Sequence, residues 1–157
     1  MINKKTIEMV AASIYLKSLG LQPQEVDFEL EPDEPADIIY IPTQEKYQVT
    51  QAQGEIGKLL NKGAVSFQHT ANQTFQEFVD IAVKRKLKKY GGGSAVSDVT
   101  LLIYDLIEPP WLERSVEESK KDLMVQKLLR ESGFREIYCV FNFPASTTPL
   151  KIYPFQT

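Results

Sequence analysis

Three short apolar runs constrain the fold of this 157-residue chain more than any other feature. Residues 36–41, 99–104 and 137–141 read Ala-Asp-Ile-Ile-Tyr-Ile, Val-Thr-Leu-Leu-Ile-Tyr and Ile-Tyr-Cys-Val-Phe. Runs of this length without polar alternation are typical of strands that are buried on both faces. We therefore expect an α/β fold in which helices cover each face of a sheet.

Helical patterns lie between these runs. Apolar spacing predicts a first helix at about residues 5–19, a second from residue 75 to residue 90, and a third at about 115–132. Ser115 with Glu118 three residues later predicts a capping box at the start of the third helix.

Two further strands accompany the run at 36–41. Apolar and acidic residues alternate from Val26 to Glu31, which predicts a half-exposed strand, and residues 46–50 predict a third strand. Short turns join these three strands, so we expect them to be antiparallel neighbours. The whole order predicts a three-layer α/β sandwich with a mixed sheet of about five strands: an α-β-β-β-α-β core plus an extra helix and strand.

The length corresponds to one domain over residues 1–157, with a core at about 5–142 and a tail, 143–157, that is irregular or an edge. No apolar run approaches the ~18–20 residues of a membrane span, and the N-terminal residues do not resemble a signal peptide. A single cysteine, Cys139, excludes an internal disulfide and a cysteine-based zinc cluster. We expect a cytoplasmic protein without a membrane partner.

Charge is unevenly distributed along the chain. The first 45 residues carry nine acidic residues and three lysines, whereas residues 84–89 carry five positive charges and no acid. An acidic half beside a basic segment suggests a metal and a polyanion as ligands. Two solvated faces of opposite charge are the alternative, and the pattern alone leaves both open.

Asp37 is the only residue in the run at 36–41 that is charged at neutral pH. Burying a carboxylate costs several kcal/mol unless it is paired or binds a cation. Gln48 and Thr50 share one face of the third strand, so Asp37 can approach them if the two strands are neighbours. One interpretation is a divalent-cation site at this face; the other is that Asp37 begins its strand and meets solvent at the end of the sheet.

These residues resemble the PD-(D/E)XK, or restriction-endonuclease-like, superfamily. The resemblance rests on the first helix, the acidic hairpin, Glu-Pro-Ala-Asp37-Ile-Ile-Tyr and Tyr-Gln48-Val-Thr50-Gln. The later helix ending Lys86-Leu-Lys-Lys-Tyr and the strand after it resemble the branch whose third strand carries a Glu-Val-Thr type sequence. The likeness spans roughly residues 5–142, and the order of elements matches the α-β-β-β-α-β core of the family.

The resemblance implies a role for each matching residue. Asp37 corresponds to the aspartate that binds magnesium, and the carbonyl of Val49 to the middle ligand. Gln48 stands where the family has glutamate, and Thr50 stands where it has the lysine that orients the attacking water. By position, Glu8 matches the glutamate often found on the first helix.

The second helix offers a replacement for the lysine missing at Thr50. At about 100° per residue, Lys86 falls in the middle of the apolar stripe of that helix. The resemblance implies that such a lysine reaches Asp37; the alternative is that it extends to solvent near the helix end. The other basic residues of the helix form a solvated face or contact phosphates of DNA or RNA: Lys84, Arg85, Lys88 and Lys89.

We therefore expect a divergent Mg²⁺-dependent nuclease-like protein that hydrolyses phosphodiester bonds. Its catalytic residues would be Asp37, Gln48, Lys86 and Glu8. The alternative is a catalytically inactive nuclease fold that serves as a binding or assembly module, because Gln48 and Thr50 both lack the expected charge. The sequence leaves open whether the chain acts alone or as a homodimer.

Overall fold

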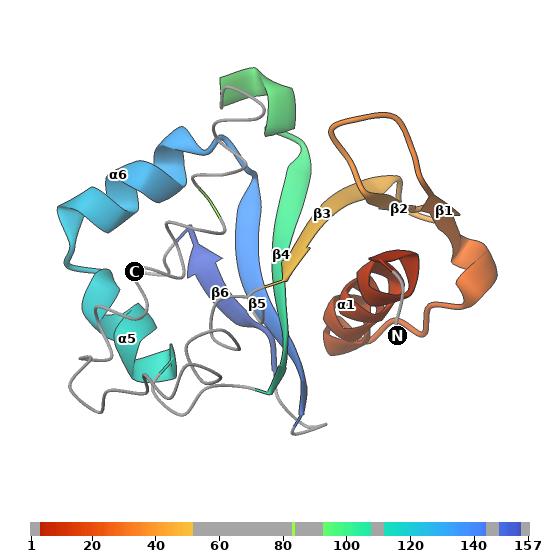
Figure 1. Cartoon of the computed structure of the whole chain (residues 1–157), viewed down its shortest axis with the longest axis horizontal. Helices are drawn as coiled ribbons and strands as arrows, with labels where there is room; N and C mark the ends of the chain where they lie inside the picture. The colour runs from red at the N-terminus through yellow and green to blue at the C-terminus, as the bar shows by residue number, and fades with distance from the viewer. Residues whose placement is uncertain (1–3, 52–82, 84–92, 108–111, 144–147, 155–157) are drawn as a thin grey trace.

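A computed structural model describes residues 4–51, 83, 93–107, 112–143 and 148–154 (Figure 1). At its centre six strands lie side by side in the order of the sequence. They are β1 (Phe28–Leu30), β2 (Ile38–Tyr40), β3 (Glu45–Gln51), β4 (Val99–Ile107), β5 (Glu136–Phe143) and β6 (Leu150–Tyr153). Strands β1 to β3 are antiparallel, β3 to β5 are parallel, and β6 is antiparallel to β5. The predicted α/β class and mixed sheet are confirmed, with six strands rather than about five.

Helices cover both faces of the sheet, as the apolar runs require. Helix α1 (Lys4–Ser18) packs on one face, and α5 (Leu112–Ser119) with α6 (Leu123–Glu131) packs on the other (Figure 1). Two short 3-10 helices are η1 (Glu25–Asp27) and η3 (Gly93–Val96). The three-layer arrangement agrees with the prediction. Within the described ranges, no helix has both the length and the apolar character needed to span a lipid bilayer.

The two cores follow the alternation of side chains along the central strands. Tyr47 and Val49 of β3 pack with α1, while Leu101 and Ile103 of β4 pack with α5 and α6. All four are at most 6% exposed. Because successive residues point to opposite faces of a strand, Gln48 must point away from α1.

The sixth strand comes from the tail. Strand β6 pairs with β5 and forms one edge of the sheet, and its Ile152 is fully buried in the core beside α5 and α6. Of the two structures that we expected for residues 143–157, the edge strand is therefore present at Leu150–Tyr153, since one apolar side chain completes that core.

The predicted strand beginning at Val26 is wrong in its first residues. Residues Glu25–Asp27 form η1, and Val26 is 84% exposed. The Asp27 carboxylate accepts the N–H of Gln24 at 2.8 Å, while the Asp27 N–H donates to the carbonyl of Gln24 at 2.9 Å. These two local bonds favour a tight turn over an extended strand.

The predicted third helix is two helices, and the predicted capping box is wrong. Ser115 lies inside α5, which begins at Leu112. The cap in this region is Asp122, whose carboxylate accepts the N–H groups of Met124 at 3.0 Å and Val125 at 3.3 Å. Aspartate at this position satisfies the free N–H groups of a new helix, so the chain starts α6 there.

Three tyrosines join α1 to the sheet. The ring of Tyr15 lies 5.8 Å from that of Tyr47 and 4.7 Å from that of Tyr138, between centroids. The Tyr47 hydroxyl donates to Glu45 at 2.6 Å, and the Tyr138 hydroxyl donates to Glu136. Burial, reinforced by the neighbouring carboxylate, raises the pKa of both Tyr47 and Tyr138. Each hydroxyl therefore stays protonated and acts as a donor.

Replacing Tyr47 by phenylalanine should lower the free energy of unfolding by about 1–3 kcal/mol at neutral pH, because Glu45 loses its donor. Urea denaturation measures this. An unfolded tyrosine loses its proton near pH 10, whereas folded Tyr47 has a raised pKa and keeps it. Its contribution is therefore complete below about pH 10 and declines above it.

The alkaline decline should be shallower in Tyr47→Phe than in the wild type. Tyr153→Phe, at the partly exposed edge strand β6, is the matched control and should lose less stability at neutral pH, because no carboxylate among the described residues accepts a hydrogen bond from its hydroxyl. Equal slopes in Tyr47→Phe and wild type would contradict this assignment.

Candidate functional site

Two hydrogen bonds join Asp37 to the residues of β3 that precede and follow Gln48. Its backbone N–H donates to the carbonyl of Tyr47 at 2.8 Å, and its carboxylate Oδ2 accepts the N–H of Val49 at 2.9 Å. These two bonds involve the residues immediately before and after Gln48. Asp37 and Gln48 therefore lie beside each other, as expected if β2 and β3 are neighbours.

Gln48 is fully buried, and a third bond ties it to the same segment. Its Nε2 donates to the carbonyl of Pro35, two residues before Asp37. Its other polar atom, Oε1, has no hydrogen-bond donor among the described residues. A buried acceptor without a donor costs about 1–3 kcal/mol. The unpaired Oε1 of Gln48 therefore destabilises the fold at a position beside the Asp37 carboxylate.

An unpartnered buried oxygen does not by itself define a site, since Ser119 Oγ at the end of α5 is in the same condition. The distinction lies in the neighbours. Gln48 is held by the segment that carries Asp37, and Asp37 is itself half-buried and lines a pocket. The chemistry of the position follows from this pairing of a carboxylate with an amide oxygen.

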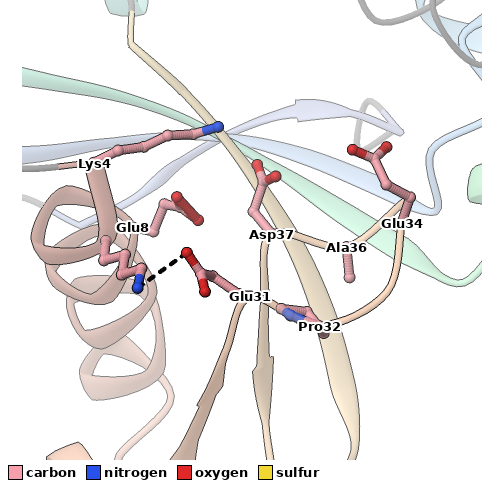
Figure 2. Close-up of a pocket in the computed structure, with 8 residues that line it drawn as sticks. Lys4, Glu8, Glu31, Pro32, Glu34, Ala36 and Asp37 are labelled. Carbon is pink, nitrogen blue, oxygen red and sulfur yellow. Dashed lines mark ion pairs between the residues drawn. The ribbon is translucent and has the colours of Figure 1, made fainter.

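The pocket lies between the first turns of α1 and the connection from β1 to β2 (Figure 2). It has a volume of about 490 Å³. Its lining is mostly ionisable: Lys4, Lys5, Glu8, Glu31, Pro32, Glu34, Ala36 and Asp37. Four carboxylates face two ammonium groups, so the lining carries an excess of negative charge.

Helix α1 contributes Glu8, which is only 7% exposed. Figure 2 shows its carboxylate on the pocket side of the helix, between α1 and the segment that carries Asp37. The structure thus brings Glu8 and Asp37 to one pocket. Lys5, in the same helix, forms an ion pair with Glu31 at 2.9 Å across this pocket.

Asp37 combines features of the two interpretations that its sequence position left open. Strand β2 begins at Ile38, so Asp37 precedes the strand and is half-buried at the end of the sheet. It is nevertheless hydrogen-bonded and faces a pocket rather than open solvent. The fully buried polar residue of the pair is Gln48, because an uncharged amide is far less costly to bury than a carboxylate.

Oxygen atoms are the ligands that Mg²⁺ prefers, usually with several waters retained. The Asp37 carboxylate and the orphaned Oε1 of Gln48 are such atoms on adjoining segments. Within the described residues, however, no three His, Cys, Asp or Glu side chains are grouped so that they could hold a metal ion. Any cation here would therefore depend on amide, carbonyl and water oxygens as well as on carboxylates.

Thr50 lies two residues beyond Gln48, on the same face of β3. In the parallel register Gln48 is opposite Leu101 and Thr50 is opposite Ile103, both in the core beside α5 and α6. The residue predicted to supply the lysine that is missing at Thr50 is Lys86, which lies outside the described residues. The predicted phosphate contacts also lie outside them: Lys84, Arg85, Lys88 and Lys89.

Of the residues in the predicted second helix, only Val83 is described. Val83 is fully buried and belongs to the same core as Leu101 and Ile103. Val83 therefore lies on the face of the sheet to which Gln48 and Thr50 point. The role predicted for Lys86 stays a prediction.

Sequence reasoning missed the lysines and acids that complete the pocket. Lys4 and Lys5 occupy the first turn of α1, where positive charge opposes the helix dipole, and this was a readable signal. Glu31 and Glu34 lie in the connection between β1 and β2. Their negative charge was the one feature of the sequence that could have indicated a place in the pocket. The carbonyl of Pro35 carries no signal in the sequence.

Comparison with protein-family models, with curated proteins and with solved structures found no match to this chain.

Proposed function

We propose that this chain is a divalent-metal-dependent phosphodiester hydrolase acting on nucleic acid. One observation carries the proposal. Asp37 is hydrogen-bonded to the two residues that flank Gln48, and the buried Oε1 of Gln48 has no donor among the described residues. An acceptor kept unpaired beside a carboxylate is costly for the fold alone and useful for a cation.

Three groups on adjoining segments would hold Mg²⁺: the Asp37 carboxylate, Gln48 Oε1 and the Val49 carbonyl. The bound ion would polarise the phosphate and lower the pKa of the attacking water. Glu8, nearly buried on the pocket side of α1, would accept a proton or hydrogen bond from that water. Lys86 is proposed to stabilise the charge that develops on the phosphate.

The substrate is proposed to be DNA or RNA. Five positive charges at residues 84–89, in a chain with a net charge of −3, are the feature that favours a polyanion. Lys84, Arg85, Lys88 and Lys89 would contact the backbone outside the cleaved bond. A cytoplasmic location and a homodimer belong to the same proposal.

A second function is an inactive nuclease fold that binds nucleic acid or assembles with other proteins. It is favoured by Thr50 in place of the lysine and by the lack of a carboxylate-rich metal group among the described residues. The two functions share the pocket and differ in whether a bond is broken.

Adding and removing metal tests the proposal. Mg²⁺ or Mn²⁺ at about 100-fold over Kd should stabilise the wild type by about 2.7 kcal/mol, which is roughly 5–10 °C in Tm for a chain of this size. The same ions should permit nicking of supercoiled DNA or cleavage of labelled RNA, and EDTA should stop it. Binding of the strands with no cleavage under any metal would favour the inactive function; neither binding nor cleavage would contradict both.

A further inference from the structure

The pocket beside Asp37 holds a lysine whose charge no group in the described chain neutralises. Lys5 is paired with Glu31 at 2.9 Å. The side chain of Lys4, one residue earlier, forms no ion pair or hydrogen bond with the part of the chain that the structure describes. Figure 2 shows the Lys4 side chain extending from α1 over the pocket, toward the side on which Asp37 lies.

Lys4 is exposed, and two features of its position bear on the binding of an anion. Lys4 stands in the first turn of α1, where the helix dipole disfavours positive charge. Its ammonium has three donors and lines a pocket with four carboxylates, yet it is within ion-pairing distance of none of them. A cation so placed is available to an anion that enters the pocket beside Asp37.

We propose that Lys4 binds a non-bridging oxygen of the substrate backbone, at or next to the phosphate held beside Asp37. The inference rests on the proposed function and adds a substrate-binding residue to it. An anionic strand entering a lining with excess negative charge is repelled, and Lys4 is the described cation there that is not already paired with an acid. Lys4 would thus act on binding of the strand, whereas Asp37 would act on the metal.

The test compares Lys4→Gln with Lys17→Gln. Lys17 is exposed in the last turn of the same helix and does not line the pocket, so both variants lose one charge from one helix. Binding of a labelled DNA duplex is measured in Ca²⁺ at several salt concentrations, with single-stranded DNA and RNA in parallel. Lys4→Gln should weaken binding about 3–10-fold at low salt and make the slope of log K against log salt shallower by about 0.9. Lys4→Arg should retain the wild-type slope.

The outcomes separate this inference from the proposed function. If the wild type binds a strand and Lys4→Gln matches Lys17→Gln in affinity and slope, Lys4 is not a phosphate contact while the proposed function stands. If the wild type binds none of the three strands at low salt, both are overturned. In cleavage assays, Lys4→Gln should raise KM with kcat nearly unchanged, and an unchanged KM would also overturn the inference.

Discussion

Replacing Asp37 by asparagine should lower phosphodiester cleavage on the order of 10³-fold while leaving the protein folded. Asparagine keeps an oxygen that can accept the N–H of Val49, a bond of 2.9 Å in the wild type. It removes the charge that would bind the cation. The loss should therefore appear in kcat and in the metal-induced rise of Tm, and only weakly in the Tm without metal.

Asp37→Ala distinguishes the contribution of Asp37 to stability from its contribution to catalysis. Alanine removes the acceptor as well as the charge, so Val49 loses its partner and unfolding should become easier by about 1–3 kcal/mol. Cleavage should be as low as in Asp37→Asn. Comparing the two variants by urea denaturation and by nicking isolates the contribution of the charge.

Asp33→Asn is the matched control. Asp33 is an exposed acid in the same connection between β1 and β2 and does not line the pocket. It should cleave at the wild-type rate and show the wild-type rise of Tm with Mg²⁺. If Asp37→Asn behaves like Asp33→Asn in both measurements, the carboxylate of Asp37 has no part in catalysis.

The sequence predicted the layers of the fold better than the ends of its elements. Apolar runs predicted β4 and β5 because strands buried on both faces are restricted to apolar residues. The run at 36–41 also located β2, but the expectation that this run is buried on both faces is wrong: Ile39 is half-buried, and Ile41 lies beyond the strand and is 45% exposed. Boundaries failed where a single side chain decided the local structure. The Asp27 carboxylate accepts a backbone N–H and stabilises η1 where a strand was predicted. The Asp122 carboxylate caps α6, so the predicted third helix is two helices, α5 and α6.

The candidate site was predictable in its strand residues and less so in its surroundings. Asp37 and Gln48 were expected to meet because antiparallel neighbours bring together residues equally far from the turn that joins them, and three hydrogen bonds hold the two segments in place. The Pro35 carbonyl that holds Gln48 is a backbone atom, which no residue pattern reveals. Lys4 belongs to the pocket only because α1 places its first turn beside the β1–β2 connection.

The hydrogen bond from Gln48 to Pro35 and the burial of the position explain why glutamine, rather than glutamate, suits position 48 in the absence of metal. The amide donates to the Pro35 carbonyl, which a carboxylate cannot do when ionised. The position is fully buried and adjoins Asp37, so a charge there would be desolvated beside a like charge. Compared with glutamate, glutamine at position 48 should bind a cation more weakly but make the metal-free protein more stable.

Gln48→Glu should lower the stability of the metal-free protein and raise its affinity for a divalent cation. Without metal we expect a loss of about 3–5 kcal/mol in the free energy of unfolding at pH 7, because an uncompensated charge is buried and the bond to Pro35 is lost. Burial and the neighbouring Asp37 should raise the pKa of the new carboxyl above its usual ~4.3. The loss should therefore grow as the pH rises from about 4 and be smallest in acid.

Divalent metal should restore part of this loss, since two adjoining carboxylates bind Mg²⁺ or Mn²⁺ more tightly than one carboxylate with an amide. The rise of Tm with metal should thus exceed that of the wild type. Gln48→Leu is the control: it removes both polar atoms without adding charge, so it should lose about 1–3 kcal/mol and regain nothing with metal. A Gln48→Glu protein that gains no more from metal than the wild type would show that position 48 does not face a cation, and Asp37 would then have to bind it without the Gln48 side chain.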